Sequence, residues 1–304
     1  MSGAIAGAIR KINFLLRTRP FKGGWRIERF LSRIMPRPDG KIGLNLPLGF
    51  KIIIDPVNNG GLEEALYYRG IYEAGTINVL ETCLTKNDIF VDVGSNIGLM
   101  SLFAAKRLSD GGKVYAFEPM PDVYAALEEN IRINGLKNIE AFNFALGERN
   151  TDLSLYREKG TNRGQASLIK PKTENEIAEH RVKVQRLDDF ILEKGIGNIK
   201  ILKIDVEGWE FAVLKGAGKL LSSSSAPILC FEFSRDENDE ESLLALYEYV
   251  LSINEYRIYK LGKGKEAVSG LVPVKGKSEL PRHDNLFCFL PKHEKIVKLL
   301  KKER

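Results

Sequence analysis

The segment FVDVGSNIG (residues 90–98) ends an apolar run with an aspartate and a turn that contains two glycines. Such a turn between a strand and a helix commonly binds nucleotides and related ligands. The turn is not G-x-x-x-x-G-K-[ST], which excludes the phosphate-binding loop of nucleoside triphosphatases. It is not G-x-G-x-x-G either, because Asn96 replaces the middle glycine. Since Asp92 would repel a phosphate, we expect a ligand with a cationic or hydroxyl-bearing end.

Glu118 follows the next predicted strand, at residues 113–119. A carboxylate there can accept hydrogen bonds from both hydroxyls of a ribose without a phosphate. The turn and Glu118 together predict a cationic, phosphate-free nucleoside, and S-adenosylmethionine fits because it has a ribose, an α-amino group and a sulfonium. We therefore expect these residues to bind that cofactor: Asp92, Gly94, Ser95, Asn96, Gly98 and Glu118.

Three further strand ends carry polar residues that should meet at the same edge of a parallel sheet. We expect Asn143 and Ala145 to flank the adenine. Asp205 either binds the amino group of the cofactor or acts as a base. Because Asp205 and Glu207 are close in the chain, we expect their repulsion to raise the pKa of one of the two carboxyl groups, which would suit a base. The catalytic candidates are Asp205, Glu207 and Glu232, with Glu207 the better base if Asp205 binds cofactor. A less favoured alternative has these three carboxylates binding a magnesium-type ion.

The elements that position these residues alternate between strand and helix. Strands are predicted at 88–93, 113–119, 138–146, 181–187, 198–208, 226–234, 256–261 and 285–290. Helices are predicted at 62–84, with breaks near Gly70 and Gly75, and at 98–108, 121–135, 188–195, 209–221 and 239–254. This alternation predicts an α/β fold with a mostly parallel sheet and helices on both faces. The last two strands lack a helix between them and should add an antiparallel edge strand. Residues 147–181 look irregular.

Charge divides the chain into a body and two basic ends. Residues 1–35 contain eight Lys or Arg and one Glu, a net charge of +7, and residues 291–304 have a net charge of +4. Subtracting both from the +6 of the chain leaves −5 for residues 36–290, which argues against a nucleic-acid partner. We predict a basic N-terminal extension with a helix and short strands (1–60), a catalytic domain (61–291) and a basic C-terminal tail (292–304).

Residues 1–35 leave two interpretations open: a basic amphipathic helix that contacts a membrane surface, or a helix packed on the domain. No apolar run approaches 18 residues, so we expect no membrane-spanning helix. The three cysteines lack C-x-x-C spacing and indicate a reducing compartment. These features predict a cytoplasmic protein that either is free or lies peripherally on the inner membrane surface.

Several motifs resemble those of the FkbM-type methyltransferase family: VDVGSNIG, FEP, NFALG, LDDF, LKIDVEGWEFAVLKGA and CFEFS. The resemblance covers about residues 70–235, and GSNIG stands where such proteins usually have GANIG. It implies a class I S-adenosylmethionine-dependent (Rossmann-like) fold. It also implies O-methylation of a hydroxyl on a sugar, a glycan, a glycolipid or a natural product.

The remaining motifs concern the acceptor and the competing functions. Residues 157–170 are the best candidate for an acceptor loop, and Trp209 should pack in the core. The candidate loop residues are Arg157, Asn162, Arg163 and Gln165.

A nicotinamide dehydrogenase is disfavoured because G-x-G-x-x-G is missing. A nucleic-acid methyltransferase would keep this fold and use the basic N-terminus, but it is disfavoured because DVEG stands at the fourth strand instead of an N/D-P-P-Y-type element. A non-catalytic, membrane-docked scaffold is disfavoured because the carboxylates for both substrates are intact.

Overall fold

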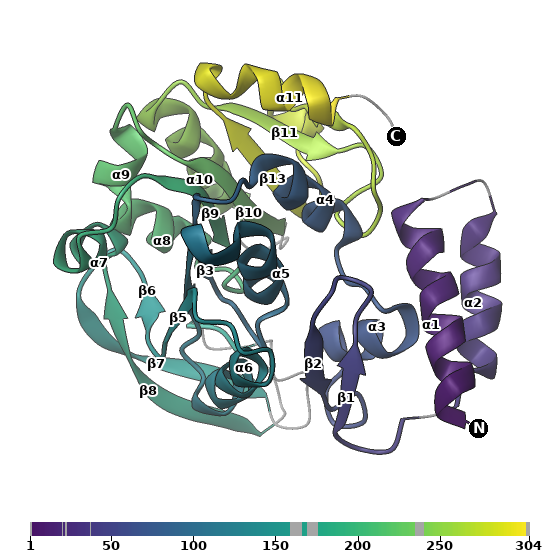
Figure 1. The fold of residues 1–304 in the computed structure, drawn as a ribbon. Coiled ribbons are helices and arrows are strands. Elements are labelled where there is room, and N and C mark those ends of the chain that lie inside the picture. The colour runs from purple at the N-terminus through teal and green to yellow at the C-terminus, as the bar shows by residue number, and fades with distance from the viewer. Residues whose placement is uncertain are drawn as a thin grey trace.

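A computed structural model describes residues 2–19, 21, 23–36, 38–158, 166–168, 176–234 and 240–301. Its centre is a sheet of eight strands in the order β12-β11-β13-β10-β9-β3-β4-β5 (Figure 1). These strands are β3 (Ile89–Val93), β4 (Lys113–Phe117), β5 (Ile139–Phe142), β9 (Ile199–Ile204), β10 (Ile228–Ser234), β11 (Arg257–Leu261), β12 (Leu271–Pro273) and β13 (His283–Phe289). From β5 through β10 every neighbouring pair is parallel. The predicted mostly parallel sheet is confirmed.

The predicted antiparallel element lies at one edge of the sheet, where β13, β11 and β12 follow β10. β13 runs antiparallel to both β10 and β11 and lies between them, so it is not an edge strand. The antiparallel edge is instead β12, which pairs with β11 and was not predicted. β12 has only three residues, too few to show an alternating pattern.

Helices cover both faces of this sheet because successive strand residues point to opposite sides. Phe90 faces the core beneath one set of helices, and Val91 faces the core beneath the other. The first set is α4 (Ala74–Cys83), α5 (Leu99–Leu108), α6 (Pro121–Ile133) and α11 (Glu294–Leu300). The second set is α7 (Leu187–Lys194), α8 (Glu210–Gly216), α9 (Gly218–Ser222) and α10 (Glu240–Ile253). Short 3-10 turns occupy Ser109–Gly111, Lys277–Glu279 and Pro291–His293.

A second sheet corrects our expectation for residues 147–181. It consists of β6 (Ala145–Leu146), β7 (Thr151–Glu158) and β8 (Ile177–Gln185), in the order β6-β8-β7. β7 pairs antiparallel with β8 over its full length. The strand predicted at 138–146 is therefore two strands in two sheets, β5 and β6. The side chains of β7 and β8 are mostly half-buried or exposed, so the sequence of this hairpin shows no strong apolar alternation.

The N-terminal extension packs against the body of the protein. It contains α1 (Ser2–Thr18), α2 (Gly24–Ile34) and the hairpin β1 (Ile42–Asn45) and β2 (Lys51–Ile54). α1 lies against α3 (Leu62–Arg69), and α2 lies beside α1 at the side of the molecule (Figure 1). β2 is tied to α6, where the side-chain oxygen of Asn130 accepts a hydrogen bond from the Ile53 N–H at 2.7 Å.

At the other end of the chain, part of the segment predicted as a tail forms α11, whose Val297 and Leu300 are buried. The predicted helix at 62–84 is interrupted at Gly70, which adopts a left-handed conformation after α3. The second predicted break is wrong, because Gly75 lies inside α4. The predicted helix at 209–221 is likewise divided, into α8 and α9. None of the helices in the described ranges has the length and apolar character that crossing a bilayer requires.

Candidate active site

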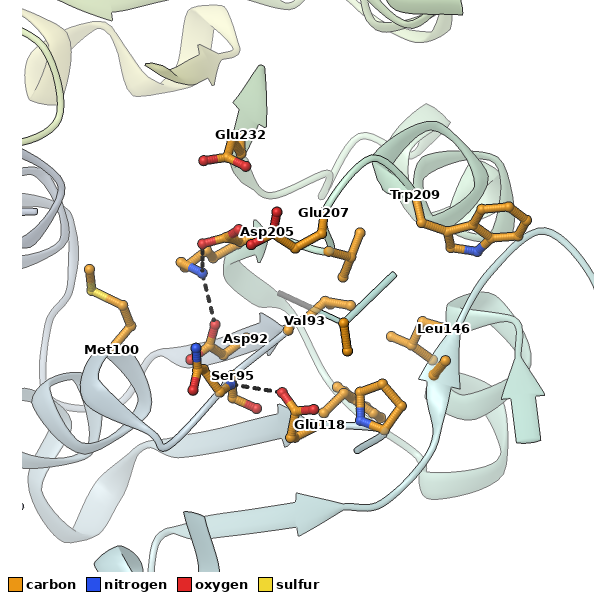
Figure 2. A pocket seen from close by; sticks show the side chains of 18 of the residues that line it. Asp92, Val93, Ser95, Met100, Glu118, Leu146, Asp205, Glu207, Trp209 and Glu232 are labelled. Carbon is orange, nitrogen blue, oxygen red and sulfur yellow. Dashed lines mark hydrogen bonds and ion pairs between the residues drawn. The ribbon is translucent and has the colours of Figure 1, made fainter. Parts of the chain in front are cut away.

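A pocket opens at the carboxyl ends of β3, β4, β9 and β10, where ligands bind in open α/β sheets. Figure 2 shows the carboxyl groups of Asp92, Asp205 and Glu232 along one side of it. Most predicted site residues reach this pocket. Those that line it are Asp92, Gly94, Ser95, Asn96, Glu118, Ala145, Asp205, Glu207 and Glu232.

The turn after β3 is fixed by its backbone. The N–H groups of Gly94 and Ser95 both donate to the Phe117 carbonyl at the end of β4, at 3.0 and 2.9 Å. Gly94 has a φ of 77°, and a Cβ there would lie 1.8 Å from the Asp205 carbonyl oxygen. Asn96 also has a positive φ, 50°, a conformation that asparagine tolerates better than most residues. Glycine at 94 is therefore required for β3 and β9 to meet at the pocket.

Glu118 connects this turn to the segment that follows β4. Its carboxylate accepts hydrogen bonds from the Asn96 N–H and the Met120 N–H, both at 2.9 Å. Burial raises the pKa of this carboxyl to about 7, although the two N–H donors favour its ionised form. Each oxygen has a second lone pair that can accept a ligand hydroxyl. This geometry suits the predicted contact with two ribose hydroxyls.

Lys203 lies between two predicted site carboxylates and was not predicted from the sequence. Its ammonium is 3.5 Å from Asp92 Oδ1 and 3.3 Å from Asp205 Oδ2. The register places Asp92 of β3 directly beside Lys203 of β9. Burial alone would lower the pKa of Lys203, but the two carboxylates raise it above its usual value. In the same way, burial opposes ionisation of Asp205, yet Lys203 and Lys265 hold its pKa below its usual range.

The loop after β9 presents Glu207 at the rim of the pocket. Glu207 has a φ of 52° and an exposed surface, although protein crowds its carboxyl group. This crowding, with the charges of Asp205 and Glu232, raises the pKa of Glu207 to about 8. The loop is held by the buried Glu210, whose carboxylate accepts hydrogen bonds from the Val206 and Gly208 N–H groups at 3.0 and 3.3 Å.

Glu232 belongs to a buried ion-pair cluster. Lys265 Nζ lies 2.5 Å from Glu232 Oε1 and 3.1 Å from Glu73 Oε1. His283 Nε2 is 3.4 Å from the same Glu232 oxygen. Burial and Asp205 raise the pKa of Glu232, while Lys265 opposes the shift. Glu73 and its neighbour Tyr72 also line the pocket, and neither was predicted from the sequence.

The side of the pocket away from these carboxylates is apolar. Phe144, Ala145 and Leu146 line it, which fits the predicted place of an adenine ring. Trp209 lines the pocket as well as packing against the core, and its buried indole N–H has no hydrogen-bond partner among the described residues. The Ser95 hydroxyl, in the turn after β3, is also buried and has no hydrogen-bond partner among the described residues. The Trp209 nitrogen lies beside Gly147, where an added Cβ would be 3.1 Å from it, so the Ser95 hydroxyl is the better candidate to bond a ligand.

Two predicted cofactor residues support the pocket from behind its wall. Asn143 is not a lining residue; its amide donates to the carbonyls of Glu118 and Pro119 at 2.9 and 3.0 Å. Gly98 begins α5, and a Cβ there would lie 2.6 Å from Leu127 Cδ1. Because β5 ends at Phe142, the chain turns before Asn143 can reach the adenine side.

The predicted acceptor loop falls largely outside the described residues, which include only Arg157, Glu158 and residues 166–168 of that segment. Asn162, Arg163 and Gln165 are among those not described. Arg157 pairs with Asp122 at 2.9 Å, and it does not line the pocket. Ala166 and Leu168 do line it.

The metal-binding alternative has little support from the geometry. In the described ranges, no three His, Cys, Asp or Glu side chains are grouped so that they could hold a metal ion. Asp205 and Glu232 have ammonium neighbours instead, Lys203 and Lys265.

Comparison with known proteins places this pocket in a family context. Residues 92–285 match the methyltransferase FkbM domain, which confirms the resemblance inferred from the motifs. The matched segment contains almost all of the pocket, from Asp92 to Glu232.

Three curated relatives illustrate the match. Methyltransferase 1 of Beauveria bassiana is 30% identical over 43% of this chain and 58% of its own length. The 31-O-demethyl-FK506 methyltransferase FkbM of Streptomyces tacrolimicus is 33% identical over 44% of this chain and 60% of its own. The hexuronic acid methyltransferase AglP of Haloferax volcanii is 29% identical over 65% of this chain and 76% of its own. The match thus spans about three fifths of the first two relatives.

Proposed function

Because this chain belongs to the family of FkbM methyltransferase domains, we propose that it is an S-adenosylmethionine-dependent O-methyltransferase. Its acceptor in this proposal is a hydroxyl on a sugar, a glycan, a glycolipid or a similar small molecule. Two of the relatives are named for acceptors of this kind, 31-O-demethyl-FK506 and hexuronic acid.

The charge of the pocket carries this proposal. Among the described residues, six carboxyl groups line it against the ammonium of Lys203, and Lys265 pairs with two of the six, Glu73 and Glu232. Such a lining attracts a cation and repels phosphate, so it favours a sulfonium-bearing nucleoside over a dinucleotide or a nucleic acid. The six are Glu73, Asp92, Glu118, Asp205, Glu207 and Glu232.

We assign the donor side of the pocket to the turn and its supports. Glu118 would accept the ribose hydroxyls, and Ser95 would bond the polar end of the donor through its unpartnered hydroxyl. Asp205 would bind the α-amino group, because its lowered pKa keeps it ionised. The apolar wall around Ala145 would enclose the adenine.

Glu207 is our candidate for the general base. S-Adenosylmethionine, when bound, supplies an electrophilic methyl group on a cationic sulfur. A hydroxyl acceptor must lose its proton as it is alkylated, and a positioned base contributes about 10²–10⁴-fold to such a step. The raised pKa of Glu207 suits proton transfer near neutral pH, whereas ionised Asp205 is too weak a base. Holding the reactants in line would supply roughly 7–11 kcal/mol more.

The proposal is tested by methyl transfer from isotopically labelled S-adenosylmethionine to a panel of sugars, uronic acids and glycolipids, read by mass spectrometry. We expect one CH₂ unit to be added to a hydroxyl-bearing compound and the Glu207→Gln variant to lose that product. Parallel reactions with a chelator decide whether a divalent metal is needed. If the panel and extracts from the native host yield no methylated product under conditions where the donor binds, the enzymatic proposal fails.

A further inference from the structure

The two N-terminal helices carry an unusual surface. Of thirteen large hydrophobic residues that are exposed in the described part of the chain, eight lie between residues 5 and 34. We call α1, α2 and their connecting turn the N-terminal helix pair. Its exposed apolar residues are Ile5, Ile12, Leu15, Phe21, Trp25, Ile27, Phe30 and Ile34, each 44–62% exposed. A concentration of this kind marks a contact surface for a partner or a membrane.

α2 is oriented opposite to an ordinary surface helix. Its buried side chain is charged: Glu28 is 6% exposed and pairs with Arg17 at 2.6 Å and with Arg69 at 3.0 Å. Its apolar stripe, Ile27, Phe30 and Ile34, has i, i+3, i+7 spacing and points outward. A helix that stabilised only this domain would bury the stripe and expose the carboxylate.

Polar anchors hold the helix pair on the domain without using that stripe. In α1, Arg10 Nε donates to the Tyr67 carbonyl at 2.7 Å, and Asn13 Nδ2 donates to the Tyr68 carbonyl at 2.8 Å. Both carbonyls belong to α3, and the buried Ala6 and Ile9 complete the contact. The outward apolar residues of α1 and α2 are therefore not needed for docking to α3, and they are available to a partner.

Charge identifies the kind of partner. Residues 1–35 have a net charge of +7, and Arg26, Arg29 and Arg33 form an exposed stripe on α2. That stripe is offset by one residue, about 100° of helical rotation, from the apolar stripe. Two copies of this surface would repel each other, whereas an anionic bilayer accepts the apolar stripe among its acyl chains and the arginines among its head groups.

We propose that the N-terminal helix pair is a docking surface for an anionic lipid bilayer. The inference is independent of the reaction catalysed in the pocket. α3, which carries the pair, leads directly to Tyr72 and Glu73 of the pocket wall. Arg69 links the N-terminal helix pair to the pocket. It pairs with Glu28 of α2, and it lies 3.9 Å from Glu266, the residue that follows Lys265 of the ion-pair cluster.

Flotation with vesicles tests the proposal on the full chain. We expect the protein to float with phosphatidylcholine vesicles that contain phosphatidylglycerol, and to float at least about tenfold less with phosphatidylcholine alone, because each basic residue near an anionic surface contributes about 1 kcal/mol. Binding should weaken as salt is raised. Failure to float with the anionic vesicles overturns the proposal.

Matched variants separate the apolar and basic contributions. Trp25→Ser with Phe30→Ser should reduce vesicle binding at least about tenfold, by removing apolar insertion. Leu192→Ser with Leu299→Ser alters equally exposed apolar residues elsewhere and should have no effect. Arg26→Glu with Arg29→Glu should reduce binding by a similar factor, and Lys86→Glu with Lys183→Glu, exposed residues elsewhere on the chain, should reduce it far less. Equal effects of the test and control variants would contradict a localised surface.

Tryptophan fluorescence gives a readout at the surface itself. The chain has two tryptophans, so Trp209→Phe leaves Trp25 as the only reporter. Its emission should shift to the blue with anionic vesicles and be quenched by brominated lipids. An unshifted emission, or a dimer in lipid-free sedimentation that Phe30→Ser dissociates, would assign the surface to another partner and overturn the proposal.

Discussion

The two sides of the pocket are built in different ways. The donor side, from Asp92 to Asn96 and Glu118, is fixed by hydrogen bonds to backbone groups of neighbouring strands. The acceptor side is fixed by charge: Lys265 joins Glu73 and Glu232, which come from segments far apart in the sequence. The donor side thus depends chiefly on backbone geometry, beside the ion pairs of Lys203 with Asp92 and Asp205. The acceptor side depends on a balance of buried charges that pH and single substitutions can change.

The difference fits the task that we propose for each side. A donor that is the same in every turnover is best held by a rigid turn. An acceptor hydroxyl needs a base with a suitable pKa, and burial together with the neighbouring carboxylates raises the pKa of Glu207. The following predictions test whether the two sides respond as differently as their construction indicates.

The largest effect is expected at Glu207. Glu207→Gln should lower kcat by about 10²–10⁴-fold with little change in donor affinity, because it removes the base and leaves the donor side intact. The wild-type rate should rise with pH through about 8, where the Glu207 carboxyl loses its proton, and the variant should lack this rise. Glu255→Gln, at an exposed glutamate outside the pocket, is the control. A variant with wild-type kcat would remove Glu207 from the mechanism.

Lys265→Met tests the charge balance of the acceptor side. It leaves Glu73 and Glu232 buried without their shared cation, which should lower the free energy of unfolding by about 3–5 kcal/mol at neutral pH. The loss should shrink as pH falls, because the raised pKa of Glu232 lets it take up a proton. Urea denaturation at several pH values measures this, with the exposed Lys263→Met as control. A loss that does not change with pH would show that packing, rather than charge, holds this side.

Gly94→Ala tests the backbone geometry of the donor side. The new Cβ would meet the Asp205 carbonyl at a left-handed φ, and we expect a loss of about 3 kcal/mol at any pH. Gly135→Ala provides a control with a similar φ of 60° and nothing within 4 Å, so it should cost only about 1 kcal/mol. Equal losses in the two variants would mean that conformation alone, not the close approach of β3 and β9, requires glycine at 94.

The smallest effect is expected at Asn143, behind the donor side. Asn143→Ala frees the carbonyls of Glu118 and Pro119 and should weaken donor binding about five- to tenfold, since a hydrogen bond contributes about 1 kcal/mol. Asn138→Ala removes a similar pair of bonds, to Ala105 and Ser109, before β5 begins. It should lower stability by a similar amount and leave donor binding unchanged. If both variants bind the donor equally well, Asn143 does not position Glu118.

The same contrast explains how much of the site the sequence predicted. The turn residues Asp92, Gly94, Ser95 and Asn96 line the pocket, and their place could be predicted because they are close in the chain and glycine spacing restricts the turn. Asp205, Glu207 and Glu232 were predicted as strand-end carboxylates, and all three line the pocket. Lys203 was missed because a lysine inside an apolar strand gives no sign of its partners until the register of β3 and β9 is known.

The other misses have related physical causes. Glu73 and Lys265 are ordinary charged residues in sequence, and only the folded sheet brings them together; Glu73 and Asn285, which are hydrogen-bonded at 2.8 Å, are 212 residues apart. The β7–β8 hairpin was missed because its side chains do not alternate strongly between buried and exposed. The central alternation of strands and helices was predicted because buried parallel strands and amphipathic helices have clear patterns.

Calorimetric titration with S-adenosylmethionine tests the central claim most directly, because it asks whether this acidic pocket binds the donor. We predict one binding site per chain, and at least about tenfold weaker binding by Glu118→Ala, since hydrogen bonds to a charged group contribute about 1.5–3 kcal/mol. The absence of any binding by the wild-type chain, or equal binding by Glu118→Ala, would contradict the account.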